Sequence, residues 1–396
     1  MNILVLGNGA REHALCYAIT KSQKLTKLFC APGNYGISNV AEVHNFDINN
    51  FDMLYDFCTE KAIDLVVVGP EVPLVNGVVD FLEAKDIKAF GPKKVPAKLE
   101  GSKIFMKDIC AQYNIPTAKY KNFIEKTAAE AYLHKQPLPV VIKASGLAAG
   151  KGVTIATTLD EGLNAINDIF NDKFGSGCEL VIEEFMDGEE ASYFVFTDGK
   201  NYIPLSSAQD HKRIGDGDTG PNTGGMGAYS PAPVFTQAIQ DQVNKEMIEP
   251  TLKAMRDLGT PYQGILYAGV MIKNNYAKLV EYNVRFGDPE CQVLMLRLRS
   301  DIVELILGTI DGNIHKIHTD WNNNHVATVV MASIGYPGEY KKGTIIKSLD
   351  ATEDLANIEV FHAGTEFKNK EVLAVGVRVL AVTSNDRDLK STVDNN

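Results

Sequence analysis

Three short apolar runs in the first hundred residues constrain the fold of this chain more than any other feature. Residues 3–6, 65–68 and 88–90 each end at a glycine, in NILVLG, DLVVVG and IKAFG. The segments between them have helical character, and apolar strands that alternate with helices predict βαβ units on a parallel sheet. Ligands of such sheets bind beyond the carboxyl ends of the strands. We therefore expect binding groups at the glycine turns that follow these strands.

The remaining chain predicts further mixed structure, so the expected fold class is α/β, in the broad sense that includes α+β. A helix should start near Lys103 and stop before Ile115, and another should cover residues 301–308. The pattern beyond Trp321 is rich in β-branched residues and indicates a small β-rich unit. Strands are expected at residues 140–143, 153–156, 179–185, 192–196, 266–272 and 278–285.

The composition limits the possible partners. A formal charge of −11 argues against sequence-independent binding to nucleic acid, which needs a basic face. The six cysteines are scattered without a C-x-x-C pair, which is typical of free thiols in a reducing compartment. We find no signal-peptide pattern at the start and no apolar run near the roughly 18–20 residues that span a bilayer. We therefore expect a cytoplasmic protein with no nucleic-acid or membrane partner.

Residues 139–156, PVVIKASGLAAGKGVTIA, carry the most informative pattern. Their glycines let the backbone approach a ligand closely, and Lys143 and Lys151 supply point charges for a polyphosphate. A P-loop has one more residue in its glycine spacing and opens a helix, whereas here the β-branched run VTI follows. We interpret the segment as two strands joined by a phosphate-binding flap. An ordinary glycine hairpin is the alternative.

Residues 181–192, VIEEFMDGEEAS, end a predicted strand in two acids and continue through a turn into two more. Carboxylates would repel phosphate, so their useful partners on a nucleotide would be the adenine N6 amino group or the ribose hydroxyls. A solvated acidic turn is the alternative interpretation.

The segment KLVEYNVRFGDPE, residues 278–290, places Glu281, Asn283 and Arg285 on one face of a predicted strand because strand side chains alternate. Such groups are costly to bury without partners. Glu281 and Asn283 offer two oxygen ligands for Mg²⁺, which takes few protein ligands. Arg285 could bind a carboxylate or phosphate with two parallel hydrogen bonds. A structural salt-bridge network is the alternative.

Residues 208–233, AQDHKRIGDGDTGPNTGGMGAYSPAP, are too rich in glycine and polar residues to build a core of their own. A disordered linker is the usual explanation of such a composition, but the specific polar pattern favours a mobile lid or substrate loop.

At the N-terminus, Gly7 and Gly9 form only a partial dinucleotide-binding pattern, because Glu12 replaces the third glycine. A phosphate held by the Gly9 N–H, Arg11 and the following helix N-terminus is the better interpretation. His13 is expected on a helix face without a catalytic role.

Taken in this order, the segments resemble the ATP-grasp superfamily and, within it, the phosphoribosylamine–glycine ligase family (glycinamide ribonucleotide synthetases). The similarity covers nearly the whole chain. The segment GDGDTGPNTGGMGAYSP favours the glycine ligases over carboxylases and other amide ligases of the superfamily. The matching segments are LGNGAREHAL, VVGPEVPLVNGVVD, LEGSKIFMK, VVIKASGLAAGKGV, VIEEFMDGEEAS, AQDHKRIGDGDTGPNTGGMGAYSP and EYNVRFGDPECQ.

The resemblance implies three domains: an N-terminal parallel-sheet pre-ATP-grasp domain (1–101), a two-lobed ATP-grasp domain (102–320) with its flap lobe at about 118–190, and a small β-rich C-terminal domain (321–396). It implies that ATP, with Mg²⁺ or Mn²⁺, drives the ligation of glycine to 5-phosphoribosylamine, giving glycinamide ribonucleotide, ADP and phosphate through glycyl phosphate. It also implies a purine-biosynthetic enzyme that is a monomer or a weak homodimer.

The resemblance further implies a role for each matching site residue. Arg285 and Lys143 would be catalytic, and Glu281 and Asn283 would hold the metal. The residues implied in ATP binding are Lys103, Lys143, Lys151, Glu183, Glu184, Phe185, Met186, Glu190 and Asn283. Those implied in substrate binding are Gly9, Arg11, Glu71, Asp210, Thr223, Gly224, Arg285 and Asp288.

The sequence departs from the family near its end. Family members carry a glycine pair before the arginine of a C-terminal strand, where this chain has Val375-Gly376-Val377-Arg378. They continue into a closing helix pair, whereas this chain ends in SNDRDLKSTVDNN, which predicts a shortened C-terminal domain. The alternatives are another ATP-grasp ligase with a different acceptor amine, an inactive nucleotide-binding protein and, on the partial glycine turn alone, a nicotinamide oxidoreductase.

Overall fold

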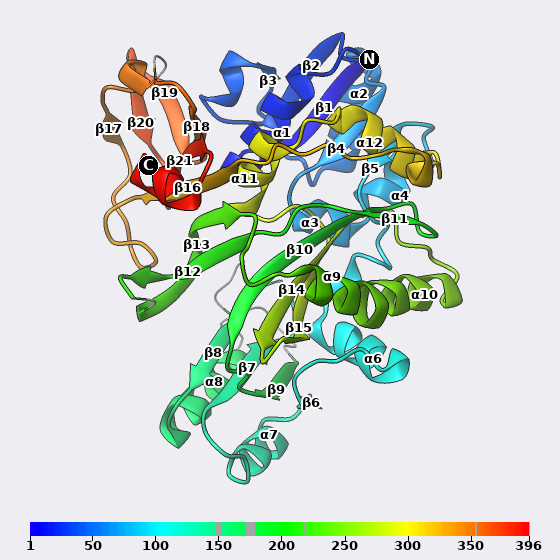
Figure 1. Cartoon of the computed structure of the whole chain (residues 1–396), viewed down its shortest axis with the longest axis vertical. Helices are drawn as coiled ribbons and strands as arrows, with labels where there is room; N and C mark the ends of the chain where they lie inside the picture. Colours follow the sequence, from blue (N-terminus) through cyan, green and yellow to red (C-terminus); the bar gives the residue numbers. More distant parts are fainter. Residues whose placement is uncertain (148–151, 172–178, 218, 353–354, 396) are drawn as a thin grey trace.

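The computed structural model describes residues 1–147, 152–171, 179–217, 219–352 and 355–395 (Figure 1). Within them, no helix is long and apolar enough to cross a membrane. The mixed α/β architecture and the parallel N-terminal sheet confirm the predicted fold class.

A five-stranded, wholly parallel sheet in the order β3-β2-β1-β4-β5 forms the N-terminal region. The apolar run of β1 is buried on both faces, as expected for a parallel strand covered by helices. Asn50 caps α2 by accepting a hydrogen bond from the Met53 N–H. The strands are β1 (Asn2–Gly7), β2 (Lys27–Pro32), β3 (Glu42–Val43), β4 (Leu65–Val68) and β5 (Lys88–Phe90), and the helices are α1 (Ala10–Thr20), α2 (Phe51–Glu60), α3 (Glu71–Asn76), α4 (Val78–Glu83) and α5 (Lys98–Gly101).

A separate lobe at the bottom of Figure 1 contains the antiparallel sheet β6-β9-β7-β8, with α7 and α8 packed on it. Thr158 and Glu161 begin α8 with reciprocal hydrogen bonds between side chain and backbone. The two predicted strands that flank the glycine flap are confirmed as β7 and β8. The bounds are β6 (Tyr120–Phe123), α7 (Lys126–Leu133), β7 (Val140–Ala144), β8 (Val153–Ala156), α8 (Leu159–Phe170) and β9 (Leu180–Glu184).

The antiparallel sheet β11-β10-β14-β15 runs through the centre of the molecule and shares one apolar core with the N-terminal sheet. Its strands β10, β14 and β15 cover the predicted ones, although β15 ends at Asn283, two residues before Arg285. The bounds are β10 (Glu189–Thr197), β11 (Tyr202–Pro204), β14 (Gly264–Lys273) and β15 (Tyr276–Asn283), with α6 (Lys103–Tyr113), α9 (Gln237–Val243), the π-helical turn η2 (Asn244–Ile248) and α10 (Glu249–Asp257) packed nearby.

The prediction of a loop over residues 208–233 is wrong. The segment forms a hairpin of β12 (Gln209–Gly215) and β13 (Thr219–Ser230), and β13 continues by pairing with β16. The glycines gave no apolar alternation to indicate a strand, but backbone ladder bonds do not need side chains. Backbone pairing, including that between the end of β13 and β16, therefore forms strands that the local composition does not indicate.

The C-terminal residues complete that same sheet, whose order is β12-β13-β16-β21-β18, and add the small sheet β17-β20-β19. The domain boundary predicted at residue 321 therefore separates strands that share one sheet. The remaining α-helices and strands are α11 (Glu290–Arg297), α12 (Ile302–Ile310), β16 (His325–Ala332), β17 (Thr344–Ile346), β18 (Ile358–His362), β19 (Thr365–Lys368), β20 (Glu371–Ala374), β21 (Arg378–Asp386) and α13 (Leu389–Asp394).

Candidate active site

A cavity of about 490 Å³ lies where the central sheet, the β6–β9 lobe and the N-terminal region meet. It brings together residues that lie far apart in the chain. The predicted site residues that line it are Arg11, Glu71, Lys103, Lys143, Glu183, Glu184, Phe185, Met186, Glu190, Asp210, Thr223, Gly224, Glu281, Asn283, Arg285 and Asp288. Gly9 lines an adjoining cavity that shares Arg11 and Asp288 with the first. Lys151 lies outside the described residues.

Two lysines and one acid form the wall of the cavity next to the β6–β9 lobe. The Lys143 Nζ on β7 lies 3.0 Å from the Glu183 Oε2 on β9. Both side chains are buried, and burial without a partner would be costly for either charge. Lys103, at the start of α6, donates a hydrogen bond to the Gly146 carbonyl. Two ammonium groups thus reach the cavity from different elements, as a polyphosphate would require.

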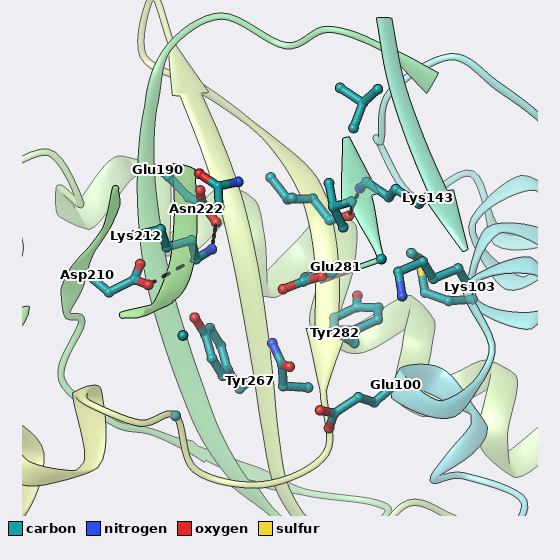
Figure 2. Close-up of a pocket in the computed structure, with 18 of the residues that line it drawn as sticks. Glu100, Lys103, Lys143, Glu190, Asp210, Lys212, Asn222, Tyr267, Glu281 and Tyr282 are labelled. Atoms are coloured by element: carbon teal, nitrogen blue, oxygen red, sulfur yellow. Dashed lines mark hydrogen bonds and ion pairs between the residues drawn. The ribbon is translucent and has the colours of Figure 1, made fainter. Parts of the chain in front are cut away.

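The opposite wall holds a second charged group, and Figure 2 shows Glu281 between the two walls. The Lys212 Nζ on β12 lies 2.5 Å from the Glu190 Oε1 on β10 and 4.0 Å from the Asp210 Oδ2. Burial raises the pKa of Asp210 to about 8, although Lys212 acts in the opposite direction. The carboxyl groups of Glu190 and Asp210 can accept hydrogen bonds from a sugar, and the Lys212 ammonium group can donate to one.

Glu281 and Asn283 supply oxygen atoms at the floor of the cavity. A β-bulge interrupts the ladder between β14 and β15 beside Glu281. Burial alone would raise the pKa of Glu281, but nearby lysine ammonium groups, that of Lys212 first, hold it below its usual value. Among the described residues, Glu281 forms no hydrogen bond or ion pair. An ionised, unpaired carboxylate beside an amide oxygen fits a divalent cation that fills its shell from phosphate and water.

No group of three or more His, Cys, Asp or Glu side chains in the described part of the chain could hold a metal ion. A metal held entirely by such side chains therefore has no candidate position there.

Arg285 is held by an acidic clamp. Its Nη2 donates to the Glu100 Oε1 at 2.7 Å and to the Asn283 Oδ1 at 3.1 Å, and its Nε donates to the Glu71 Oε2 at 3.3 Å. Burial lowers its pKa, but Glu100 and Glu71 outweigh that effect and raise it. The guanidinium is therefore a fixed positive charge between the side-chain oxygens of Glu281 and Asn283 and the N-terminal turn.

The N-terminal turn differs from the predicted phosphate cradle in one detail. The Gly9 N–H donates to the Glu12 Oε2 at 2.6 Å, and Arg11 donates to the Glu12 Oε1 at the same distance. The Glu12 carboxylate thus accepts hydrogen bonds from the Gly9 N–H and the Arg11 guanidinium, the two groups predicted to bind a phosphate. A phosphate here would have to share them with this carboxylate.

Comparison with known proteins matches this geometry to one family over most of the chain. Models described as the N domain, the ATP-grasp (A) domain and the C domain of phosphoribosylglycinamide synthetase match residues 1–100, 101–291 and 326–396. The phosphoribosylamine–glycine ligase of Brucella melitensis is 51% identical over 97% of this chain and 90% of its own length. The chain belongs to the phosphoribosylamine–glycine ligase family. It is an ATP-dependent ligase.

Other relatives of this ligase are similar over most of the chain. The chloroplastic phosphoribosylamine–glycine ligase of Arabidopsis thaliana is 52% identical over 96% of this chain and 73% of its own length. The crystal structure of phosphoribosylamine–glycine ligase from Thermotoga maritima has a TM-score of 0.83 at 29% identity, covering 99% of this chain and 94% of that one. N5-carboxyaminoimidazole ribonucleotide synthetase from Thermus thermophilus, with a TM-score of 0.69 at 16% identity, shares the fold.

Several residues that line the cavity of the ligase were not predicted from the sequence. Glu100 binds Arg285 from a helix that ends the N-terminal region, and as a single acid in the segment KLEG it gave no distinctive pattern. Glu290 accepts hydrogen bonds from the Tyr267 hydroxyl at 2.6 Å and the Ser192 hydroxyl at 3.0 Å. The segment FGDPE contained Glu290, but only the fold brings its two partners to it.

Arg378 shows how the C-terminal residues of the ligase reach the site. From β21, its Nη1 donates to the Gly224 carbonyl at 2.6 Å and the Asp288 carbonyl at 2.8 Å, and its Nη2 lies 3.2 Å from the Asp288 Oδ2. The altered sequence before this arginine therefore does not prevent it from contacting two predicted substrate-binding residues.

Proposed function

We propose that this cavity catalyses the ATP-dependent ligation of glycine to 5-phosphoribosylamine, giving glycinamide ribonucleotide, ADP and phosphate. The observation that carries the proposal is a single cavity lined by three kinds of group. These are two lysine ammonium groups, a carboxylate without a partner among the described residues beside an amide, and an arginine held between two acids. A carboxylate is a poor electrophile, so its activation by phosphate from ATP precedes attack by the amine. Such a phosphoryl transfer depends mainly on positioning and on neutralising charge.

The nucleotide would lie between the β6–β9 lobe and the central sheet. Lys103, Lys143 and Lys151 would contact the phosphates, and Glu190 would accept hydrogen bonds from the ribose. The segment from Glu183 to Met186, which lines the cavity, would surround the adenine. The structure adds one constraint, because the Glu183 carboxylate is paired with Lys143. Backbone groups of this segment are therefore the better candidates for contact with the adenine.

We propose Mg²⁺, with Mn²⁺ as a substitute, as the metal held by Glu281 and Asn283. When bound, it would neutralise phosphate charge during transfer. The chain itself keeps Glu281 ionised and holds Asn283 by its bond from Arg285. These two effects prepare the oxygens without any contribution from the metal.

Arg285 would anchor the glycine carboxylate and then the acyl phosphate, since the acidic clamp fixes its orientation. The glycine-bearing edge of β13, with Thr223 and Gly224, would border the same substrate. The phosphoribosylamine would extend toward the N-terminal turn, where Arg11, Glu71 and Asp288 line the cavity and Gly9 lines its neighbour. The lobe would exclude water, which would otherwise hydrolyse glycyl phosphate.

The decisive assay measures ADP formation by the purified protein with ATP, glycine and freshly generated phosphoribosylamine. We expect ADP release to require both substrates, and glycinamide ribonucleotide to form in equal amount. Turnover with another amino acid or acceptor amine in place of these would indicate a different ligase. ATP binding without product would indicate an inactive nucleotide-binding protein.

We further propose that the enzyme works in the cytoplasm as a monomer or a weak homodimer. Light scattering across a concentration series should give a mass near 43.3 kDa that rises only at high concentration. A constant mass of a larger assembly would contradict this.

A further inference from the structure

Lys107 is a fully buried lysine that lies outside the cavity lining, and its ammonium group pairs with a residue of the site. It lies on α6, one turn after Lys103, and its side chain is 0% exposed. Its Nζ lies 3.2 Å from the Glu183 Oε1, while the other oxygen of Glu183 faces Lys143. A buried ammonium is costly to maintain, so this placement calls for an electrostatic reason.

The three side chains form a buried row, which we call the lysine–glutamate–lysine row: Lys107, Glu183 and Lys143. Each carboxylate oxygen faces one ammonium group, so the row carries a net charge of one positive unit. Lys143 has three N–H donors, and its Nζ lies 3.0 Å from the Glu183 Oε2 and 3.5 Å from the Val280 carbonyl oxygen. With these two contacts among the described residues, one donor stays available to a phosphate.

Lys107 also ties the row to the strand that carries the metal-binding oxygens. Its Nζ donates to the Thr117 hydroxyl at 2.7 Å, and that hydroxyl donates to the Leu279 carbonyl at 2.7 Å. Leu279 lies on β15, two residues before Glu281. One ammonium group therefore connects α6, β9 and β15 behind the cavity.

We propose that Lys107 is a positioning residue for ATP: it neutralises Glu183 so that Lys143 keeps its positive charge for the nucleotide phosphates. Without Lys107, Glu183 and Lys143 would form a neutral pair that attracts polyphosphate less strongly. This inference rests on the proposed contact between Lys143 and the phosphates.

The test uses inorganic tripolyphosphate as an inhibitor competitive with ATP, because it probes the phosphate site without adenine. We expect Lys107→Met to raise both its inhibition constant and the KM for ATP about tenfold, the effect of one unit charge acting across roughly 10 Å at an effective dielectric constant of about 20. The KM for glycine should not change. Glu183→Gln should lower the inhibition constant, since the row then carries two positive units.

The double variant Lys107→Met/Glu183→Gln restores one positive unit, so its inhibition constant should return close to that of the unchanged protein. Its comparison with Glu183→Gln tests the charge balance even if Lys107→Met alone does not fold. Thr117→Val removes the hydrogen bond to Lys107 but keeps every charge, and it should leave the inhibition constant nearly unchanged.

The inference would be overturned, and Lys107 left a purely structural residue, by unchanged inhibition in Lys107→Met. A double variant that tripolyphosphate inhibits more weakly than either single variant would overturn it as well. Lys143→Met separates this failure from that of the proposed phosphate contact. If Lys143→Met weakens inhibition while Lys107→Met does not, only the inference fails. If Lys143→Met has no effect, the phosphate contact itself fails.

Discussion

At the scale of single residues, Glu281 is the side chain on which the proposed metal site depends most directly. It is ionised, faces the cavity and has no partner among the described residues (Figure 2). We expect Glu281→Gln to reduce metal-dependent turnover about 100-fold or more, because the amide cannot supply the negative charge. Turnover measured across a Mg²⁺ titration, with a thermal melt to show the fold intact, checks this.

Glu60→Gln is the matched control for Glu281→Gln, since Glu60 is exposed and pairs with its neighbour Lys61 on the surface. It should behave like the unchanged protein. Metal-dependent turnover of Glu281→Gln at the normal level would remove Glu281 from the metal site.

Arg285 makes a second prediction at this scale. Lysine keeps the charge but cannot donate to Glu100, Glu71 and Asn283 with one planar group. We expect Arg285→Lys to lower kcat about 10- to 100-fold, and steady-state kinetics with varied glycine would measure it. Arg256→Lys is the control, because Arg256 is not among the residues that line the cavity and donates a hydrogen bond to the Gly199 carbonyl. Normal kinetics of Arg285→Lys would show that the arginine is only structural.

At the scale of elements, the hairpin of β12 and β13 depends on a glycine beside α11. Gly225 has φ +106°, and a Cβ there would lie 2.4 Å from the Pro289 side chain. We expect Gly225→Ala to lower the free energy of unfolding by roughly 2–3 kcal/mol from backbone strain and overlap. Ligase activity should fall as well, because the change would displace the two preceding residues, Thr223 and Gly224, which line the cavity.

Gly217→Ala is the control at the tip of the same hairpin. Its φ is also positive, +69°, but no heavy atom lies within 4 Å of the added Cβ. It should lose only about 1 kcal/mol. Denaturant unfolding of both variants measures the difference, and equal losses would show that contact with Pro289 has no role.

The same element shows where sequence reasoning succeeds and where it stops. The runs of β1, β4, β7 and β15 were predictable because their apolar or alternating patterns are local. Many residues that line the cavity were also predictable, since Lys143, Glu281 and Asn283 lie on β7 and β15, and Arg11 and Glu71 follow β1 and β4. The β12–β13 hairpin was not, because its glycines leave no apolar alternation and the end of β13 pairs with β16, about 100 residues later. Glu100 and Lys107 were missed for a related reason: their partners, Arg285 and Glu183, come from distant segments.

At the scale of the whole molecule, the C-terminal strands lie against a helix of the N-terminal region, as Figure 1 shows for β18 near α1. Asn34 donates one hydrogen bond to the Asn8 carbonyl in the N-terminal turn and another to the His362 carbonyl on β18. Arg378 provides a second connection, to Asp288. The geometry of the substrate end of the cavity therefore depends on how the two ends of the chain pack together.

This packing should make stability sensitive to acid through His13 and His362, two buried histidines that meet at the interface. Burial lowers the pKa of His13 to about 3, with the neighbouring His362 adding to the effect, and burial lowers that of His362 to about 4. Below an unfolded pKa of about 6.5, the unfolded chain binds protons that the folded chain does not. Stability is therefore present at neutral pH and lost as pH falls from about 6.5 toward 4.

We expect a loss of roughly 2 kcal/mol for each histidine by pH 5, seen as a fall in the thermal midpoint between pH 7 and pH 5. In His13→Asn, an amide oxygen can replace the Nδ1 that accepts the His362 N–H, at 2.8 Å, without titrating. Its midpoint should therefore fall less over the same range. His318→Asn changes an exposed histidine and should keep the full pH dependence. An identical fall in His13→Asn and the unchanged protein would show that protonation at this interface does not govern acid stability.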